Sequence, residues 1–360
     1  MSQTQTASVA PMSGERRFLA AARRERVDAT PVWFMRQAGR CLADYRRLRE
    51  RHDILTLAKT PDLCAEVTLM PIAAFGVDAA VMFADIMLPL EPMGVRLEIQ
   101  PEIGPIIHNP IRTAADVDTL RVIEPEAEVP FVLDAIRLVR RELEGRRAVI
   151  GFSGAPFTLA CYLIEGRPSR EYAVAKAFMY REPDAWHALL GKLAEVVGRY
   201  LRAQADAGAQ VLQLFDSWVG ALSPSDYARH VAPHSARVFR SVRDVPTIHF
   251  GTQTAALLEQ LAAAGGDLLG IDHRQELDAA WSRIGRHRGV QGNLDPVRVL
   301  AGWDAAREGT DRVLAQAAGR PGHIFNLGHG VLPDSDPAIL RELVAYVHER
   351  SARVGAPVPS

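Results

Sequence analysis

The chain has 360 residues, of which 48% are hydrophobic and 24% are charged, a composition typical of soluble globular proteins. Its formal net charge of −1 excludes a general basic field for nucleic acid, so an anionic ligand must be held by a local cluster of arginines. The three cysteines, Cys41, Cys64 and Cys161, form no Cys-x-x-Cys pair. Such an odd and sparse set argues against a disulfide framework and indicates a reducing compartment.

The composition of the two ends predicts the domain organisation. Residues 1–13 are polar and lack an apolar core, which predicts a flexible N-terminal tail rather than a signal peptide. We expect a second short tail over 353–360. The remaining residues, 14–352, are predicted to form one catalytic domain, because α/β barrels of this length have a single core.

The most apolar region of the chain, from Leu69 to Val95, is not a membrane span. It is interrupted by Asp78, Asp85 and Glu91, and each charge inside a bilayer is costly. We therefore expect a cytoplasmic protein with no membrane partner and no nucleic-acid partner.

Short apolar runs are separated by longer segments of helical periodicity. Largely apolar runs of this length are typical of parallel strands covered on both faces. Eight such runs are predicted to be strands: Pro31–Met35, Ala79–Phe83, Ala148–Phe152, Gln210–Phe215, Val245–Phe250, Leu268–Ile271, Gly289–Gly292 and Ile324–Leu327.

The clearest predicted helices lie in the middle and at the end of the chain. One begins near Asp184 and is stopped by Gly208. The last begins at Asp336, a capping residue followed by Pro337 at the first helical position. The central helix carries one apolar stripe, made of Trp186, Leu189, Leu190, Leu193, Val196, Val197 and Tyr200.

Eight strands that alternate with helices predict an α/β fold, a single (β/α)8 TIM barrel with a deep cleft at the C-terminal ends of the strands. An open doubly wound sheet is the alternative, but no Gly-x-Gly-x-x-Gly follows the first strand. The stretch from Leu88 to about Pro130 is predicted to be an insertion, a small hairpin plus a helix over the barrel mouth.

The barrel fold predicts the site, because TIM barrels keep their chemistry at the carboxyl ends of the strands. Read in chain order, these ends supply two arginines, several carboxylates, hydroxyl groups and two histidines. The residues are Arg36, Gln37, Arg40, Asp85, Ser153, Gly154, Pro156, Tyr162, Asp216, Ser217, His249, Asp272, Asn293, Asp295, Asn326, His329 and Gly330.

Several of these residues have a structural interpretation that the sequence leaves open. Asp216 and Asp295 are equally well read as helix caps. Ser217 could cap a turn, and Tyr162 could be a core tyrosine. Arg36 and Arg40 could form surface ion pairs.

For two of the candidates, the neighbouring sequence favours a functional role over a structural one. Asp85 is followed by an apolar run that makes a helix cap less favourable. His329 lies between two glycines with little local structure to support, which favours a functional histidine.

Several standard chemistries are excluded by the residues present. None of the lysines, Lys59, Lys176 and Lys192, lies at a predicted strand end, where a Schiff-base aldolase needs one. There is no His-x-His, His-Glu-x-x-His or Walker A sequence. His230 and His234 have the spacing of metal ligands on a helix, but Pro233 lies between them.

The strand-end segments resemble those of the uroporphyrinogen decarboxylase family, from about Phe18 to Val347. The segment Pro31-Val-Trp-Phe-Met-Arg-Gln-Ala-Gly-Arg40 is close to its N-terminal signature. Similar blocks are Phe83-Ala-Asp-Ile86, Gly151-Phe-Ser-Gly-Ala-Pro-Phe-Thr-Leu159 with Tyr162-Leu-Ile-Glu-Gly166, Phe215-Asp-Ser-Trp218, Gly292-Asn-Leu-Asp-Pro296 and Phe325-Asn-Leu-Gly-His-Gly330.

The resemblance implies a homodimer of (β/α)8 barrels that uses no cofactor and no metal. It implies decarboxylation of the four acetates of uroporphyrinogen III, a small-molecule tetrapyrrole, to give coproporphyrinogen III and four CO2 in haem biosynthesis. The chain departs from the family pattern at Cys41, Ala43, Ala84 and His273, and these departures affect loop shape more than the charged groups.

The resemblance also implies roles for the strand-end residues. Asp85, Arg36 and Arg40 are the expected catalytic residues, with Asp85 stabilising a cationic pyrrole and the arginines holding substrate carboxylates. The same three residues are expected to bind substrate together with Gln37, Ala38, Gly39, Tyr162, Ser217 and His329.

Two other functions remain as alternatives. A zinc- and corrinoid-linked methyltransferase of the same superfamily would need His and Cys ligands near the late strands, and no cysteine follows Cys161. A barrel that only binds tetrapyrroles would need none of the catalytic groups, yet Arg36, Arg40, Asp85 and His329 are all present.

Overall fold

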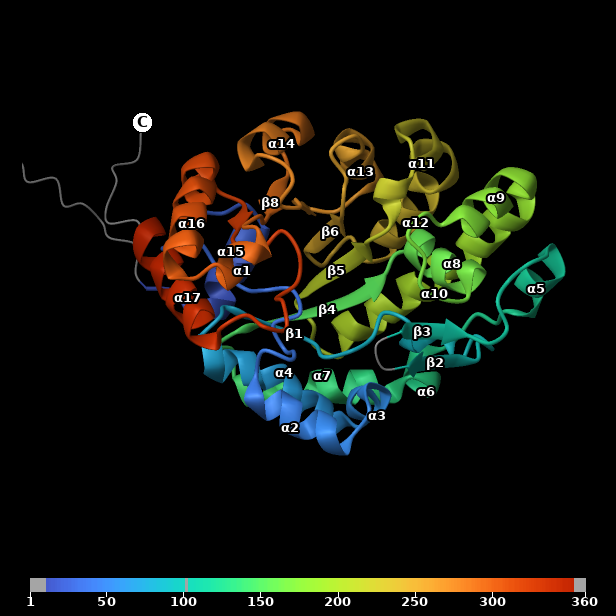
Figure 1. Cartoon of the computed structure of the whole chain (residues 1–360), viewed down its shortest axis with the longest axis horizontal. Coiled ribbons are helices and arrows are strands. Elements are labelled where there is room, and N and C mark those ends of the chain that lie inside the picture. Colours follow the sequence, from blue (N-terminus) through green and yellow to red (C-terminus); the bar gives the residue numbers. More distant parts are fainter. Residues whose placement is uncertain (1–10, 101–102, 353–360) are drawn as a thin grey trace, which may run out of the picture.

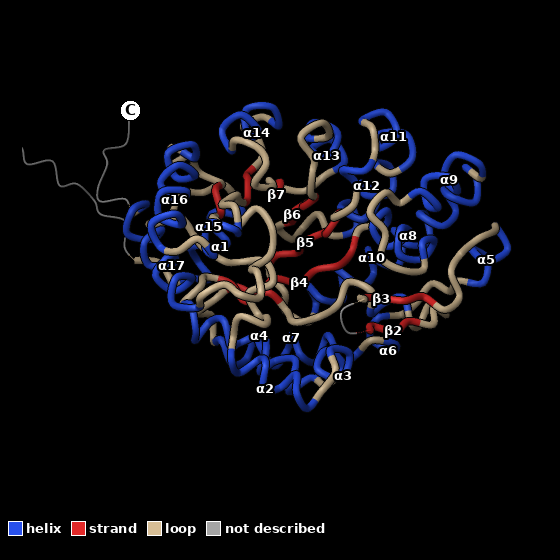
Figure 2. The backbone as a smooth tube through the Cα atoms, viewed as in Figure 1, coloured by secondary structure: helices blue, strands red, loops and turns tan. Residues whose placement is uncertain are grey.

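A computed structural model describes residues 11–100 and 103–352 of the chain. Residues 1–10, most of the predicted N-terminal tail, and 353–360, the predicted C-terminal tail, lie outside the described residues. The centre of the fold is a curled sheet of seven parallel strands surrounded by helices (Figures 1 and 2). The strands follow one another in chain order, which is the topology of the predicted (β/α)8 barrel.

The strands confirm seven of the eight predicted runs. All seven bury nearly every residue, as expected for parallel strands covered on both faces. In sheet order they are β1 (Ala79–Val81), β4 (Ala148–Gly154), β5 (Val211–Asp216), β6 (Thr247–Gly251), β7 (Leu268–Gly270), β8 (Gly289–Gln291) and β9 (His323–Ile324).

The helices form the outer layer, and the two predicted most clearly are confirmed. The apolar stripe of the central helix is buried, and the last helix is capped by the Asp336 carboxylate, which accepts from the Ala338 N–H at 2.8 Å. The α-helices are α1 (Gly14–Ala22), α2 (Ala43–Arg51), α3 (Ile54–Lys59), α4 (Pro61–Phe75), α5 (Ala114–Thr119), α6 (Pro125–Glu128), α7 (Pro130–Leu143), α8 (Pro156–Glu165), α9 (Ala173–Arg181), α10 (Pro183–Asp206), α11 (Pro224–His230), α12 (Ala232–Ser241), α13 (Leu258–Ala264), α14 (Leu277–Ile284), α15 (Pro296–Leu300), α16 (Trp303–Ala317) and α17 (Pro337–Ser351). The 3-10 helices are η1 (Leu88–Leu90) and η2 (Val219–Ala221).

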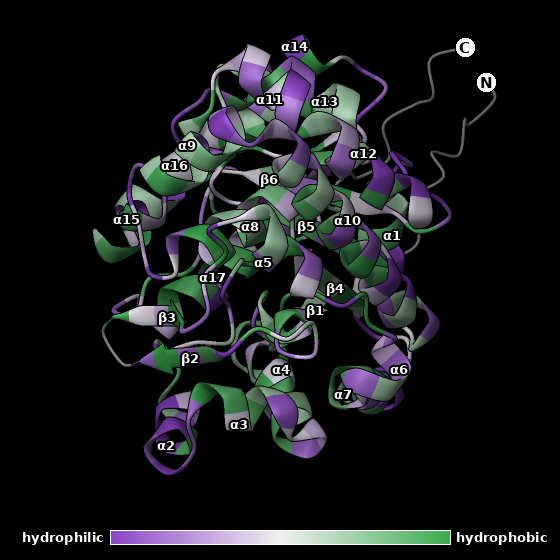
Figure 3. Cartoon of the chain, turned by 90° about the vertical axis from the view of Figure 1, so that its right-hand side faces the viewer, coloured by the Kyte–Doolittle hydropathy of each residue, from purple (hydrophilic) through white to green (hydrophobic). Residues whose placement is uncertain are grey.

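The helices differ in how much of their surface the core covers. Figure 3 shows α2 as a largely hydrophilic ribbon, and Tyr45 is its one buried residue. In the described part of the chain, no helix combines the length and the apolar character needed to cross a membrane.

The insertion after β1 forms the hairpin predicted from the sequence. Strands β2 (Leu97–Gln100) and β3 (Gly104–Ile107) pair antiparallel, and α5 follows them. The Ile107 N–H donates to Gly166 O at 2.8 Å, which fixes the hairpin to the end of α8. Figure 1 places the hairpin, α8 and α9 on the side to which the β4 arrow points, the carboxyl side of the barrel.

The first predicted strand, Pro31–Met35, is the exception. Only Val32 makes a bridge, parallel to Phe325, although the Trp33 N–H also donates to Phe325 O at 3.3 Å. The segment therefore occupies the eighth position, between β1 and β9, without a regular ladder. One reason is that Pro31 has no N–H, and another is that the Val32 N–H bonds to a side chain.

That side chain is Asp78, at the amino end of β1 and 1% exposed. Its Oδ2 accepts from the Val32 N–H at 2.8 Å and lies 2.7 Å from His348 Nε2 of α17. Its Oδ1 accepts from Arg17 Nη1 of α1 at 2.7 Å. One carboxylate therefore connects β1, the closing segment and the two terminal helices.

Side chains fill the barrel interior, so it is not a pore. Trp33 Nε1 donates to Gln291 Oε1 at 2.8 Å, and Gln291 Nε2 donates to Gln213 Oε1 at 3.1 Å. Nearer the mouth, Phe215 makes edge contacts with Phe152 and Phe250, with ring centroids 5.4 and 5.9 Å away. These three rings form an apolar floor under the mouth.

We expect Asp78→Ala to lower the free energy of unfolding by about 3–5 kcal/mol, because it leaves buried donors without their acceptor. Chemical denaturation of the purified variant measures this loss. Asp44→Ala is the control, because the Asp44–Arg47 pair is 64% and 68% exposed and is worth less than about 1 kcal/mol. Equal losses in the two variants would contradict the role of Asp78.

Candidate active site

The loop that follows the closing segment carries Arg36 into the barrel mouth. Arg36 has a left-handed backbone, with φ of +57°. Its stem packs against the loop after β9, where a Cβ added to Gly330 would lie 2.5 Å from Arg36 Cδ. Only glycine allows this approach, so the first and last loops of the barrel fix Arg36 together.

Gln37 is buried and holds this loop to the barrel. Its Oε1 accepts from the Phe34 N–H at 3.0 Å, and its Nε2 donates to Ala79 O at 3.0 Å. Its main-chain N–H donates to Phe34 O at 3.1 Å. The polar groups of Gln37 are therefore used inside the protein, whereas the N–H groups of Ala38 and Gly39 meet no acceptor among the described residues.

Asp85 is half-buried just beyond β1. Its Oδ1 accepts from the Met87 N–H at 2.8 Å, and within the described residues no protein donor reaches Oδ2. Burial raises the pKa of Asp85, while the Met87 N–H and the positive charge of Arg36 lower it. The negative charge of Glu91 acts in the raising direction, although Glu91 is itself paired with Lys59 at 2.5 Å.

Tyr162 of α8 faces the same space. Burial raises the pKa of Tyr162 to about 12, and the charge of Asp85 adds to this rise. Arg36 acts in the opposite direction. Arg36 and Asp85 therefore both lie near enough to act on the Tyr162 hydroxyl.

His329, half-buried in the loop after β9, is the fourth member of the group. Burial lowers its pKa to about 4, and the positive charge of Arg36 adds to this effect. His329 is therefore neutral near pH 7. The loop lies close to His273, whose backbone a Cβ on Gly328 would strike.

Arg40 lies apart from this group. It is exposed, and its carbonyl accepts from Arg46 Nη1 at 2.6 Å. Its charge acts on Tyr45, whose pKa burial raises and Arg49 and Arg40 lower. Arg36 is exposed as well, but its charge acts on Asp85, Tyr162 and His329, whereas that of Arg40 acts on Tyr45.

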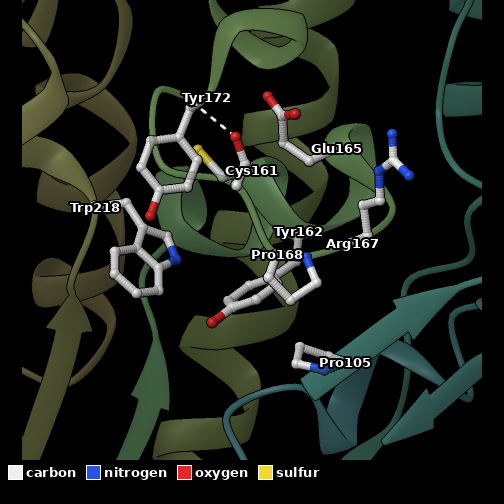
Figure 4. A pocket seen from close by; sticks show the side chains of 9 residues that line it. Pro105, Cys161, Tyr162, Glu165, Arg167, Pro168, Tyr172 and Trp218 are labelled. Carbon is white, nitrogen blue, oxygen red and sulfur yellow. Dashed lines mark hydrogen bonds between the residues drawn. The ribbon is translucent and has the colours of Figure 1, made fainter. Parts of the chain in front are cut away.

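A cavity of about 220 Å³ lies beside Tyr162, between α8, the loop from α8 to α9, Trp218 and Pro105 of the hairpin. Trp218 packs against Tyr162 and Tyr172, with ring centroids 6.0 and 5.4 Å away. Figure 4 shows these three aromatic side chains around the cavity, with Cys161 in its wall. Burial raises the pKa of the Cys161 thiol well above its ordinary value.

Sequence reasoning assigned no role to the other residues that line this cavity. They are Pro105, Glu165, Arg167, Pro168, Ser169 and Tyr172. Trp218 also lines the cavity, and the sequence pointed to it only through its place next to Ser217. Ser217 itself is half-buried at the end of β5, and its carbonyl accepts from Thr252 Oγ1 at 2.7 Å.

Several other strand-end candidates have structural roles. Asp295 caps α15 through the Val297 N–H at 3.0 Å, so the cap interpretation is confirmed there. Asp272 accepts from the Arg274 N–H at 2.9 Å and from the Gln253 N–H, and so organises two turns. Asn326 Oδ1 accepts from the Met35 N–H at 3.1 Å.

Asp216 and His249 face the helices and not the mouth. His249 pairs with Leu214 and Asp216 with Gly251, so both side chains lie on the face opposite to Gln213. Asp216 Oδ1 accepts from Thr158 Oγ1 of α8 at 3.2 Å and caps no helix among the described residues. The cap interpretation of Asp216 was therefore wrong.

The histidine pair noted in the sequence lies between helices. His234 Nε2 is 2.9 Å from His187 Nδ1 of α10, and His187 stacks on His230. Across residues 11–100 and 103–352, no group of three or more His, Cys, Asp or Glu side chains is placed to hold a metal ion.

Comparisons with known proteins identify the family of the chain. The family model described as "Uroporphyrinogen decarboxylase (URO-D)" matches residues 13–350. Proteins named "Uroporphyrinogen decarboxylase" from Carboxydothermus hydrogenoformans and Sorangium cellulosum are each 52% identical to the chain. These matches cover 93% and 95% of this chain, and 96% and 99% of the relatives.

Solved structures show the same fold at low identity. A methyltransferase from Methanosarcina mazei superposes with a TM-score of 0.80 at 19% identity. The match covers 94% of this chain and 99% of that protein, and it shows the fold alone. The family match over nearly the whole chain, together with the 52% identity of full-length relatives, shows that this chain belongs to the uroporphyrinogen decarboxylase family.

Proposed function

We propose that this chain is a uroporphyrinogen decarboxylase, a carboxy-lyase that converts the four acetates of uroporphyrinogen III to methyl groups and releases four CO2. The observation that supports the proposal is the packing of the Arg36 stem against Gly330, next to His329, together with the effect of the Arg36 charge on Asp85, Tyr162 and His329. Family membership supports the same activity.

The substrate supplies its own electron sink. Protonation of a pyrrole carbon makes a cationic ring, and the bond to CO2 then breaks with its electrons moving into that ring. Protonation of the exocyclic methylene gives the methyl group, and loss of the proton first added to the ring carbon returns the ring to neutrality. The protein must stabilise positive charge and deliver protons, and no organic cofactor is needed.

We assign the stabilisation of the cation to Asp85. Its free Oδ2 accepts hydrogen bonds from pyrrole N–H groups, while Oδ1 is held by the Met87 N–H. The phenylalanine floor of Phe152, Phe215 and Phe250 supports the pyrrole rings and reduces the local dielectric constant. A charge on Asp85 therefore acts strongly on a cation above it.

The remaining groups hold the eight carboxylates of the substrate. Arg36 provides a bidentate fork next to Asp85 and, directly or through a water molecule, a proton. Arg40 and the N–H groups of Ala38 and Gly39 take carboxylates further out. We assign Tyr162, Ser217 and neutral His329 to hydrogen bonds with the remaining acetate and propionate groups of the substrate.

The oligomeric state, the compartment and the pathway of the enzyme are proposed from the same resemblance. We propose a homodimer of barrels in the cytoplasm, acting in haem biosynthesis without a metal or cofactor. Its substrate is a small-molecule tetrapyrrole.

The decisive experiment gives chelator-treated protein uroporphyrinogen III without oxygen and separates the products after oxidation. We expect the seven-, six- and five-carboxylate intermediates and then coproporphyrinogen III. Binding without CO2 release would indicate a tetrapyrrole carrier. Activity that needs added zinc would indicate chemistry of the methyltransferase kind, and either result would contradict the proposal.

We expect Asp85→Asn to keep substrate binding and to lower kcat by about 100-fold or more, because only the cationic state needs the charge. Single-turnover kinetics and equilibrium binding measure the two effects separately. A near-normal kcat would remove Asp85 from the mechanism.

We expect Arg36→Lys to raise KM and lower kcat although it keeps the charge, because lysine lacks the planar fork. Steady-state kinetics test this, with Arg47→Lys as the control, since Arg47 is 68% exposed on α2. Unchanged kinetics of Arg36→Lys would show that the fork geometry is irrelevant.

The low pKa of His329 predicts an acid dependence of stability. Between the ordinary value of 6.5 and about 4, the unfolded chain binds a proton at His329 that the folded chain does not. The free energy of unfolding therefore falls as the pH falls through this range. Denaturation at a series of pH values should show that the free energy of unfolding falls less steeply with falling pH in His329→Asn than in the unmodified protein. An equal slope in the two proteins would contradict the burial of His329.

Two comparisons make this measurement specific. His287→Asn is the control, because His287 is an exposed histidine. Burial also lowers the pKa values of His234 and His323 to about 4. These two histidines are present in both variants, so their contribution to the pH dependence of the free energy of unfolding is the same in both.

A further inference from the structure

A buried carboxylate lies behind the mouth, outside the mechanism described above. The side chains of Asp216 on β5 and His249 on β6 are both 0% exposed. Asp216 Oδ2 lies 3.6 Å from His249 Nε2, beyond the length of a normal hydrogen bond. Neither this oxygen nor the two His249 ring nitrogens have a hydrogen-bond partner among the described residues.

Thr158 connects this pair to the substrate site. Its Oγ1 donates to Asp216 Oδ1 at 3.2 Å and accepts from the Trp218 N–H at 3.4 Å. Thr158 precedes Tyr162 by four residues, so both lie on one face of α8. One hydroxyl thus connects the helix that carries Tyr162 to the turn that carries Ser217 and Trp218.

The same turn is held from β6. Thr252 Oγ1 donates to Ser217 O at 2.7 Å. A Cβ on Gly251 would lie 3.0 Å from Asp216 O, and a Cβ on Gly220 would strike Thr252 O, so these backbones pass in close contact. The turn between β5 and η2 is therefore fixed on both sides.

Burying a carboxylate costs several kcal/mol unless its partners compensate, and an apolar side chain would fill this position at no such cost. Asp216 nevertheless lies one residue before the substrate-facing turn and bonds to the helix on its other side. Its position is thus suited to orienting its neighbours.

We infer that Thr158 and Asp216 form a positioning unit that sets Tyr162 of α8 relative to Ser217 and Trp218. The two residues touch no substrate, and they act on binding through the placement of Tyr162 and Ser217. This inference rests on the proposed function for its kinetic test.

Thr158→Val removes the hydroxyl and keeps the shape of the side chain. We expect KM for uroporphyrinogen to rise about 5- to 10-fold with kcat within about twofold, which is the effect of one hydrogen bond. Thr158→Ser, which keeps the hydroxyl, should restore a KM near that of the unmodified enzyme. Asp216→Leu, which removes the acceptor of this bond, should give a similar rise in KM.

Two comparisons separate positioning from general destabilisation. Ser235→Ala also removes a buried hydroxyl of the helix layer, but one without a bond to this unit, and should leave KM unchanged. In a Tyr162→Phe, Ser217→Ala background, Thr158→Val should change KM by less than about twofold. An unchanged KM in folded Thr158→Val, or an equal effect in both backgrounds, overturns the inference.

A readout without substrate keeps this test independent of the proposed function. The near-UV circular dichroism of Trp218, obtained by difference from Trp218→Phe, should change in Thr158→Val and not in Thr158→Ser. An unchanged Trp218 signal overturns the positioning unit even if the enzyme is active. Absence of decarboxylation in the unmodified protein contradicts the proposed function alone.

Discussion

The barrel closes because the carboxylate of Asp78 replaces a strand partner that the backbone cannot supply. Pro31 begins the closing segment and has no N–H, and the Val32 N–H meets Asp78 Oδ2 instead of a carbonyl. Arg17 and His348 bind the same carboxylate, so charge and hydrogen bonding hold the seam where the regular ladder stops. The arginine loop begins directly after this segment, and its position in the mouth depends on the seam at the other end of the barrel.

The mouth combines a low-dielectric floor with a small number of charges. Burial raises the pKa of Asp85, and Arg36 favours its ionised form. The same arginine helps to keep His329 neutral. In the proposed mechanism, a cationic ring above Asp85 adds a second positive charge near this carboxylate, which favours the reaction intermediate over the neutral ring of the substrate. The helix layer behind the mouth supplies rigidity through Thr158 and Asp216.

Features set by local sequence were predictable. Apolar runs identified seven strands, and Asp336 and Asp295 cap helices through bonds to residues two positions away. Features set by distant partners were not. The closing segment looked like a strand because its substitute acceptor, Asp78, lies far along the chain, and Gln37 looked available until its bond to Ala79 O was visible.

The candidate site shows the same division. Motif positions predicted Arg36, Asp85, Tyr162 and His329 as site residues, and the charge of Arg36 acts on the other three. Asp216 faces the helices because of which β5 residues point into the barrel. An apolar run that is buried on both faces does not reveal which of its residues point inward. No local pattern marks Tyr172 as a neighbour of Trp218, because their contact joins α9 to a turn after β5.

The seam also joins the beginning of the chain to its end. Val32 bridges Phe325, and the stem of Arg36 rests on Gly330. A ribosome makes residue 36 early and residue 330 almost last, so a nascent chain cannot assemble this mouth until translation is nearly complete. Truncated products of interrupted translation would thus lack the assembled mouth.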